Sequence, residues 1–180
     1  MRARFLPLFR ARLILASLPL LGAAGCVSLP SSPAALTMRT PVFSPADFFV
    51  GRTEGSGTLA VIGGRRTAIR VASIGHVEPD GTLVVTQSVR EGDKPVRQRT
   101  WRIRQIAPGK FAGTLSDAAG PISGVIDGNL LHLTFRMKGG LTADQRLYLR
   151  ADGRTVFNRM AVRKVGVVVA VLAETITKTE

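Results

Sequence analysis

In residues 129–137, NLLHLTFRM, apolar and polar side chains alternate from Leu131 to the end of the segment. The odd-numbered positions from Leu131 to Met137 are apolar, and the even-numbered positions from His132 to Arg136 are polar. A period of two places each set on its own face of an extended chain, so this segment is predicted to be a strand with one buried face.

Similar segments rich in valine, isoleucine, threonine and aromatic residues recur along the chain, such as TLVVTQSV (82–89), TWRIRQI (100–106) and RLYLR (146–150). Turn signals separate these segments at residues 63–66, 79–81, 91–95, 107–110, 117–121, 127–129, 138–140 and 151–153. Short strands with evenly spaced turns are typical of antiparallel sandwiches and barrels. We therefore predict an all-β fold, an antiparallel up-and-down barrel of about eight or nine strands.

The last segment, KVGVVVAVLAETITK (164–178), is the most apolar part of this region. Its valines favour a strand over a helix, and its uncharged stretch is much shorter than the roughly 20 residues of a transmembrane helix. We expect this strand to close the barrel against a first strand near residues 54–62. At most a short helical turn is expected, around Pro45 to Phe49.

The N-terminal residues have the layout of a signal peptide. Four arginines precede an apolar stretch from Leu13 to Ala24, and Gly25 and Cys26 follow; this order is typical of secretion signals. Small residues leading into a cysteine resemble a bacterial lipobox, which implies a diacylglycerol on the Cys26 thiol. A free thiol or an intermolecular disulfide are the alternatives. By resemblance to Gram-negative lipoproteins, Val27 after the cysteine favours the outer membrane, facing the periplasm.

The chain is therefore divided into a signal peptide (1–25), a lipidated cysteine with a Pro/Ser-rich tether (26–46) and one barrel domain (47–180). Without its signal the chain keeps 21 basic and 12 acidic residues. This positive charge fits an anionic lipid surface or a solvated arginine-rich face. Nucleic acid is not expected as a partner, because no recognition motif is present.

Residues for catalysis or metal binding are sparse. The chain has two histidines, His76 and His132, one cysteine, and no G-x-S-x-G motif. A metal site gathers three or four ligands, and the glycine pairs do not open a helix as a nucleotide-binding loop would. We expect no cofactor, no metal and no enzymatic activity.

The inward faces of the predicted strands define a candidate ligand cavity, since a barrel of about eight strands is just wide enough to be filled by side chains or to hold one small ligand. Its candidate wall consists of Leu83, Val85, Gln87, Val89, Arg99, Trp101, Ile103, Leu131, Leu133, Phe135 and Met137. Arg99 shares a face with Trp101. An inward guanidinium must be paired, either with Gln87 or a backbone carbonyl, or with the carboxylate or phosphate of a bound lipid.

Four stretches carry a resemblance to a known family: FFVGRTEGSGTL (48–59), RQRTWRI (97–103), GVIDGNLLHLTFRM (124–137) and RLYLRADGRTVFNRMAVRKVG (146–166). Together with the lipobox and the tether they resemble a proteobacterial lipoprotein family of unknown function, domain-of-unknown-function family 3833. The resemblance implies a lipocalin-like (calycin) barrel and an envelope location, but no activity.

Two functions follow as hypotheses. The first is an outer-membrane-anchored periplasmic lipoprotein whose barrel binds or carries a fatty acid, a phospholipid or another apolar ligand. The alternative is a non-catalytic envelope module that docks through a basic face on anionic lipid or on a protein partner, whose identity the sequence does not indicate.

Overall fold

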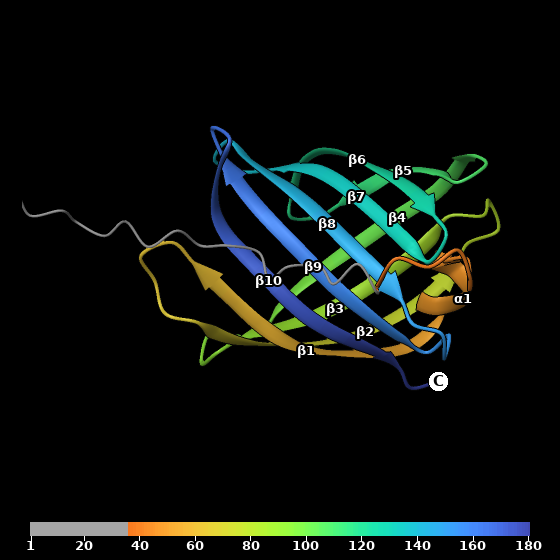
Figure 1. The fold of residues 1–180 in the computed structure, drawn as a ribbon, viewed down its shortest axis with the longest axis horizontal. Helices are drawn as coiled ribbons and strands as arrows, with labels where there is room; N and C mark the ends of the chain where they lie inside the picture. The colour runs from red at the N-terminus through yellow and green to blue at the C-terminus, as the bar shows by residue number, and fades with distance from the viewer. Residues whose placement is uncertain (1–35) are drawn as a thin grey trace, which may run out of the picture.

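The computed structural model describes residues 36–180, which form a closed barrel capped at one end by a short helix (Figure 1). The elements are α1 (Pro45–Phe49), β1 (Gly51–Val61), β2 (Thr67–Val77), β3 (Leu83–Glu91), β4 (Arg97–Ala107), β5 (Lys110–Leu115), β6 (Ala118–Asp127), β7 (Leu130–Met137), β8 (Leu141–Leu149), β9 (Thr155–Lys164) and β10 (Val167–Lys178). Each strand pairs antiparallel with its sequence neighbours, and β10 closes the barrel against β1. The all-β antiparallel barrel and its closure are confirmed.

The strand count is higher than predicted, since the barrel has ten strands. The turn between β9 and β10 consists of Val165 and Gly166, both with positive φ (47° and 81°). Two-residue hairpin turns of this kind usually contain Asn, Asp or Gly. A valine at the first position hid the turn within an apolar run.

The turn expected at residues 117–121 is also shorter than predicted. Only Ser116 and Asp117 lie between β5 and β6. Gly120 and Pro121 belong to β6, where the pairing with β7 shifts register between Ala118 and Ile122. Proline lacks the N–H that a regular ladder requires, so it is accommodated at this irregularity.

The helical turn at Pro45–Phe49 is confirmed. Ser44 begins α1 and its Oγ accepts a hydrogen bond from the backbone N–H of Asp47 at 3.3 Å, as an N-cap residue does. Phe48 of α1 is buried and packs near Phe43, with ring centroids 6.0 Å apart. These aromatic side chains close one end of the barrel.

Residues 36–46, assigned to the tether, lie against this end of the barrel. Asn129, in the β6–β7 turn, accepts from the Met38 N–H (2.7 Å) and donates to the carbonyls of Leu36 and Leu149 (both 2.7 Å). Gly128 has φ +55°, and a Cβ there would lie 2.2 Å from the Met38 carbonyl oxygen. This turn therefore fixes the chain that enters the barrel.

The interior contains two hydrophobic clusters. The larger one includes Phe43, Phe48, Trp101 and Phe135 and extends from the capped end. The smaller one consists of Ile69, Val71, Val89 and Leu172. No helix within residues 36–180 has the length and apolarity needed to cross a bilayer.

Candidate lumenal site

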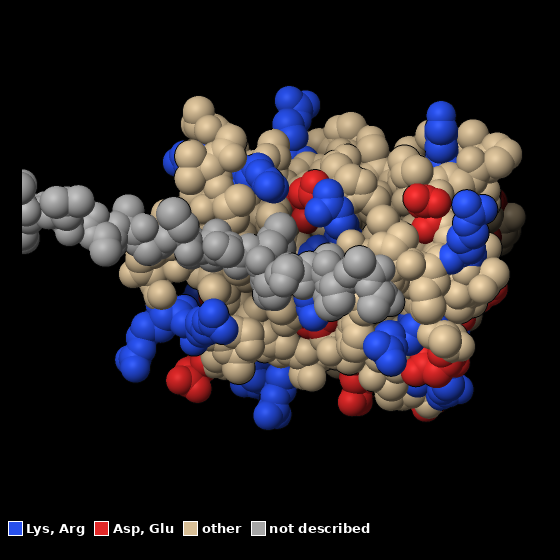
Figure 2. Space-filling view, in the orientation of Figure 1, with Lys and Arg blue, Asp and Glu red and all other residues tan. Residues whose placement is uncertain are grey.

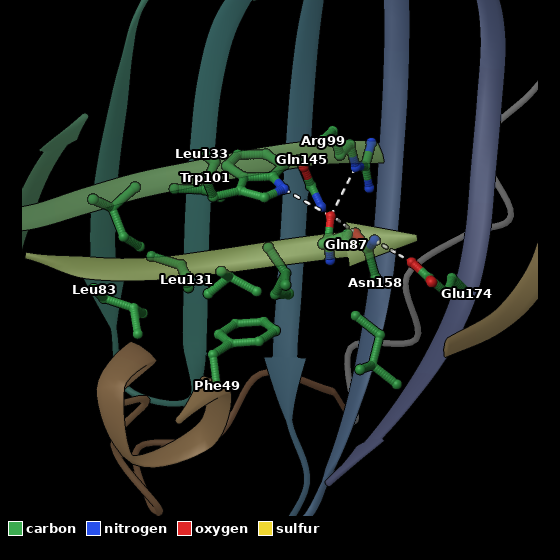
Figure 3. A pocket seen from close by; sticks show the side chains of 14 residues that line it. Phe49, Leu83, Gln87, Arg99, Trp101, Leu131, Leu133, Gln145, Asn158 and Glu174 are labelled. Carbon is green, nitrogen blue, oxygen red and sulfur yellow. Dashed lines mark hydrogen bonds between the residues drawn. The ribbon is translucent and has the colours of Figure 1, made fainter. Parts of the chain in front are cut away.

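A small cavity lies inside the barrel above the capped end (Figure 3). Its volume is about 40 Å³, which is enough for about three water molecules. Its lower wall is apolar and includes Phe49, Leu83 and Leu131. Its upper part is polar, with Gln87, Arg99, Gln145, Asn158 and Glu174. We call these five residues the polar layer.

Gln87 lies on β3, and its side chain forms hydrogen bonds to side chains on both neighbouring strands, β2 and β4. Its Oε1 accepts hydrogen bonds from Arg99 Nε at 2.7 Å and from Trp101 Nε1 at 2.8 Å, and its Nε2 donates to Ser73 Oγ at 3.1 Å. The antiparallel register places Gln87 opposite Arg99, so both side chains point into the lumen. The arginine–glutamine pairing is thus one of the two arrangements expected from the sequence.

Arg99 brings a positive charge into this interior. Its guanidinium carbon lies 5.7 Å from the centre of the Trp101 ring, and Trp101 in turn packs edge-on against Phe135 at 5.6 Å. Desolvation lowers the pKa of Arg99 from its ordinary value, but arginine remains charged in proteins. Within residues 36–180, neither Nη atom of Arg99 donates a hydrogen bond.

A second chain of hydrogen bonds crosses the other side of the lumen, on β8, β9 and β10. Gln145 Nε2 donates to Asn158 Oδ1 (3.1 Å), and Asn158 Nδ2 donates to Glu174 Oε2 (2.8 Å). Glu174 is 3% exposed, and its Oε1 has no partner within the described chain. A Cβ on Gly55 would lie 2.1 Å from that oxygen. Glycine at this position of β1 therefore provides the space for the carboxyl group.

The family of proteins of unknown function DUF3833 matches residues 20–178. The chain belongs to the DUF3833 family. No curated protein matches this DUF3833 chain.

Two solved structures resemble the DUF3833 barrel in fold. The S-type phycobiliprotein lyase CPES from Guillardia theta is 9% identical with a TM-score of 0.58, and the match covers 73% of this chain and 88% of the lyase. A protein of unknown function from the DUF3598 family of Nostoc punctiforme is 12% identical with a TM-score of 0.59, over 77% of this chain. The DUF3833 chain spans about half the length of that second protein, as the match covers 50% of it. At these identities the similarity shows the fold alone.

Most of the predicted cavity wall of the DUF3833 protein is brought together. Eight of its eleven residues line the cavity: Leu83, Val85, Gln87, Arg99, Trp101, Ile103, Leu131 and Leu133. Val89 lies in the smaller hydrophobic cluster, Phe135 is buried against Trp101, and Met137 packs at the edge of the larger cluster. Cys26 lies outside the described residues.

Six lining residues were missed: Phe49, Gln145, Leu147, Asn158, Glu174 and Ile176. In β8 the alternating positions Ala143, Gln145, Leu147 and Leu149 are all buried, so Gln145 shares the inward face with leucines. That signal was available in the sequence. The same alternation places Glu174 on the inward face of β10 with Leu172 and Ile176, but a carboxylate within an apolar strand is ordinarily assigned to the outside.

The histidines lie elsewhere. His132 is on the outer face of the barrel, where its Nε2 is 3.3 Å from Asp144 Oδ1. Neither His132 nor His76 lines the cavity. Among residues 36–180, no group of three His, Cys, Asp or Glu side chains is placed to hold a metal ion.

The stability of the DUF3833 barrel is expected to depend on pH through Glu174. Desolvation raises the pKa of Glu174 above its ordinary 4.5, against the opposing effects of the Asn158 hydrogen bond and the Arg99 charge. The folded state therefore binds this proton more tightly than the unfolded state does. The contribution of Glu174 to the free energy of unfolding is largest below the ordinary pKa and declines as pH rises through the raised one.

Urea denaturation of the wild type and of Glu174→Gln across this pH interval checks the prediction. The glutamine variant is neutral at all pH values, so its stability relative to wild type should increase with pH and then level off. Glu54→Gln, at an exposed position of β1, is the control. If the difference in free energy of unfolding between wild type and Glu174→Gln did not change with pH, the Glu174 carboxyl would have the same pKa in the folded and unfolded states.

Proposed function

We propose that this protein is a lipid-anchored envelope protein whose barrel binds an amphipathic molecule by its carboxylate at Arg99. One observation carries the binding proposal. A charged guanidinium lies in the lumen above an apolar wall, and its two Nη atoms donate to no other residue of the part of the chain that the structure describes. Guanidinium groups bind carboxylates through paired, charge-assisted hydrogen bonds.

The polar layer accommodates the charge of such a ligand. Gln87 holds Arg99 by Nε alone, which leaves the outer two nitrogens for the carboxylate. Because desolvation already raises the pKa of Glu174, this side chain can take up a proton as the anion binds. A single ion pair, between Arg99 and the ligand, then remains in the lumen.

The apolar tail of the ligand requires more space than the cavity offers. Small-molecule sites have volumes of about 300–1,000 Å³, whereas this cavity has about 40 Å³. The lining between Arg99 and Phe49 is apolar, so a tail extending from the polar layer would point toward α1. This helix has five residues and contacts β2 and β3. We propose that displacement of Phe49 makes room for the tail.

Binding rather than catalysis is proposed, since neither histidine lines the lumen and no imidazole base is therefore available there. The anchoring part of the proposal rests on the sequence around Cys26 and on its resemblance to a lipobox. If the Cys26→Ser variant still incorporated labelled palmitate, the proposed lipid anchor at Cys26 would be contradicted. Fractionation of the labelled protein tests the proposed outer-membrane location.

The binding test compares dodecanoate with dodecanol, which share a tail but differ in charge. A chain beginning at Val27 lacks the cysteine and contains every described element, and its single tryptophan, Trp101, lies beside Arg99 and reports binding by fluorescence. Dodecanoate is expected to bind at least about tenfold more tightly than dodecanol. Phe49→Ala should strengthen binding of both ligands. Equal affinity of wild type for the two ligands would refute recognition of a carboxylate by Arg99.

A further inference from the structure

The end of the barrel opposite α1 carries an unusual surface. Because the strands run up and down, five connections lie at this end (the left end in Figure 1): residues 62–66, 92–96, 116–117, 138–140 and 165–166. We call them the rim loops. They are separate from the lumenal site, whose floor is formed by α1.

Exposed aliphatic side chains gather at two neighbouring rim loops. Val61 and Ile62 are 42% and 46% exposed at the end of β1, and Val165 and Val167 are 94% and 59% exposed at the β9–β10 turn. The Ile62 N–H donates to the Val169 carbonyl at 2.8 Å, so the β1–β2 loop begins beside the first residues of β10. Large aliphatic side chains exposed together at one end of a barrel are unfavourable in water and mark an interaction surface.

The backbone of Val165 supports the same conclusion. Its φ of +47° lies in the left-handed region, which is strongly unfavourable for a β-branched residue. At 94% exposure the side chain has almost no packing within the barrel to compensate for this strain. Asparagine or glycine would form the same turn more favourably. A strained position without compensating contacts indicates that the valine is required for something outside the barrel.

Positive charge surrounds the aliphatic patch. Arg65, Arg66, Lys138 and Lys164 are exposed and form no ion pair within residues 36–180. Of the acidic residues at this end, Glu91 pairs with Lys94 and Asp117 with Arg97. The remaining acid is Asp93. In Figure 2 several blue side chains project from the left end, with red atoms beside them at the lower left.

We propose that the rim loops dock on the surface of a bilayer that contains anionic phospholipid. The cations contact the phosphates of the headgroups, while Ile62, Val165 and Val167 enter the interfacial region. Aliphatic tips surrounded by Lys and Arg are the combination that peripheral membrane surfaces use, because apolar burial and electrostatic attraction add. This charge complementarity selects an anionic bilayer as the occupant.

The test measures binding of the chain beginning at Val27 to vesicles by co-sedimentation. Without Cys26, binding reports the rim loops and not an acyl anchor. Vesicles of phosphatidylcholine with one-third phosphatidylglycerol are expected to bind the protein, whereas pure phosphatidylcholine vesicles bind it much more weakly. Added salt should reduce the binding, since it screens exposed charges.

Two variants and their matched controls locate the surface. Arg65→Gln/Arg66→Gln should weaken binding by about fivefold for each lost charge, whereas Lys110→Gln, at the α1 end, should not. Val165→Asn should weaken it by about three- to tenfold through lost apolar burial, while thermal unfolding moves to higher temperature because the backbone strain is relieved. Val42→Asn, at an exposed position near α1, should leave binding unchanged.

The opposite changes in binding and stability separate docking from misfolding for Val165→Asn. Equal binding to neutral and anionic vesicles, or unchanged binding in both rim variants, would overturn the proposal. The proposal would also be overturned if the protein self-associated in the absence of vesicles and Val165→Asn abolished that self-association. The rim loops would then be a contact between two copies of the chain.

Discussion

Replacing Asn129 by alanine is expected to lower the free energy of unfolding by about 3 kcal/mol. The Asn129 side chain is 1% exposed and makes three hydrogen bonds, to Met38 N, Leu36 O and Leu149 O. Alanine removes all three and leaves the partner groups unsatisfied in a buried region, where each contributes about 1 kcal/mol or more. The chain before α1 would also lose its attachment to the β6–β7 turn.

Urea denaturation measures this effect, and amide hydrogen exchange localises it. The Phe43 N–H donates to the Gly128 carbonyl at 2.8 Å, so its exchange should accelerate in Asn129→Ala more than exchange in the central strands. Gln105→Ala is the control, because this exposed amide makes one local bond to the Ala107 carbonyl and should change stability by less than about 0.5 kcal/mol. Equal stability of Asn129→Ala and wild type would show that the entering segment is held in another way.

Replacing Arg99 by methionine is expected to weaken dodecanoate binding by about 10- to 100-fold, because a charge-assisted hydrogen-bond pair is lost. Dodecanol binding should be unchanged, so the preference for the carboxylate disappears. Methionine retains the length of the side chain in an apolar form. Gln87 Oε1 keeps its hydrogen bond from Trp101 Nε1, so no acceptor is left unsatisfied. The variant should therefore fold, and removal of a desolvated charge offsets its lost contacts.

Arg97→Met provides the matched control for this experiment. Arg97 lies two residues earlier on β4, where its side chain is 51% exposed and pairs with Asp117. Its replacement should change dodecanoate affinity by less than about twofold, as expected for an exposed ion pair. If both variants weaken binding equally, the anion is attracted by the general positive charge of the barrel and not held at Arg99.

The alternation of apolar and polar side chains along the sequence predicted much of the barrel. In β7 the odd-numbered positions from Leu131 to Phe135 are buried as their period of two requires. Arg99 and Trp101 face the lumen together for the same reason. The apolar strand at the end of the chain needed partners on both edges, and β1 and β9 provide them.

Local sequence signals failed to predict the structure where a residue is of a type that is unusual for its place in a turn or strand. The tenth strand was missed because Val165 occupies a turn position that favours asparagine or glycine. Pro121 was interpreted as part of a turn, although an irregular pairing admits it into β6. Two of the five residues of the polar layer, Gln87 and Arg99, were predicted. Glu174 can be inside only because Gly55, far away in sequence, leaves space for it.

The sequence by itself determined that this chain forms an antiparallel barrel, which side chains of most strands face inward, and that Arg99 lies beside Trp101. Periodicity and turn chemistry are local properties, so they can be read along the chain. Only the tertiary structure decided that Asn158 and Glu174 meet the same lumen as Arg99, that the cavity is small, and that Ile62 and Val165 lie at the same end of the barrel. These features depend on the register and closure of ten strands, which bring together residues that no local pattern relates.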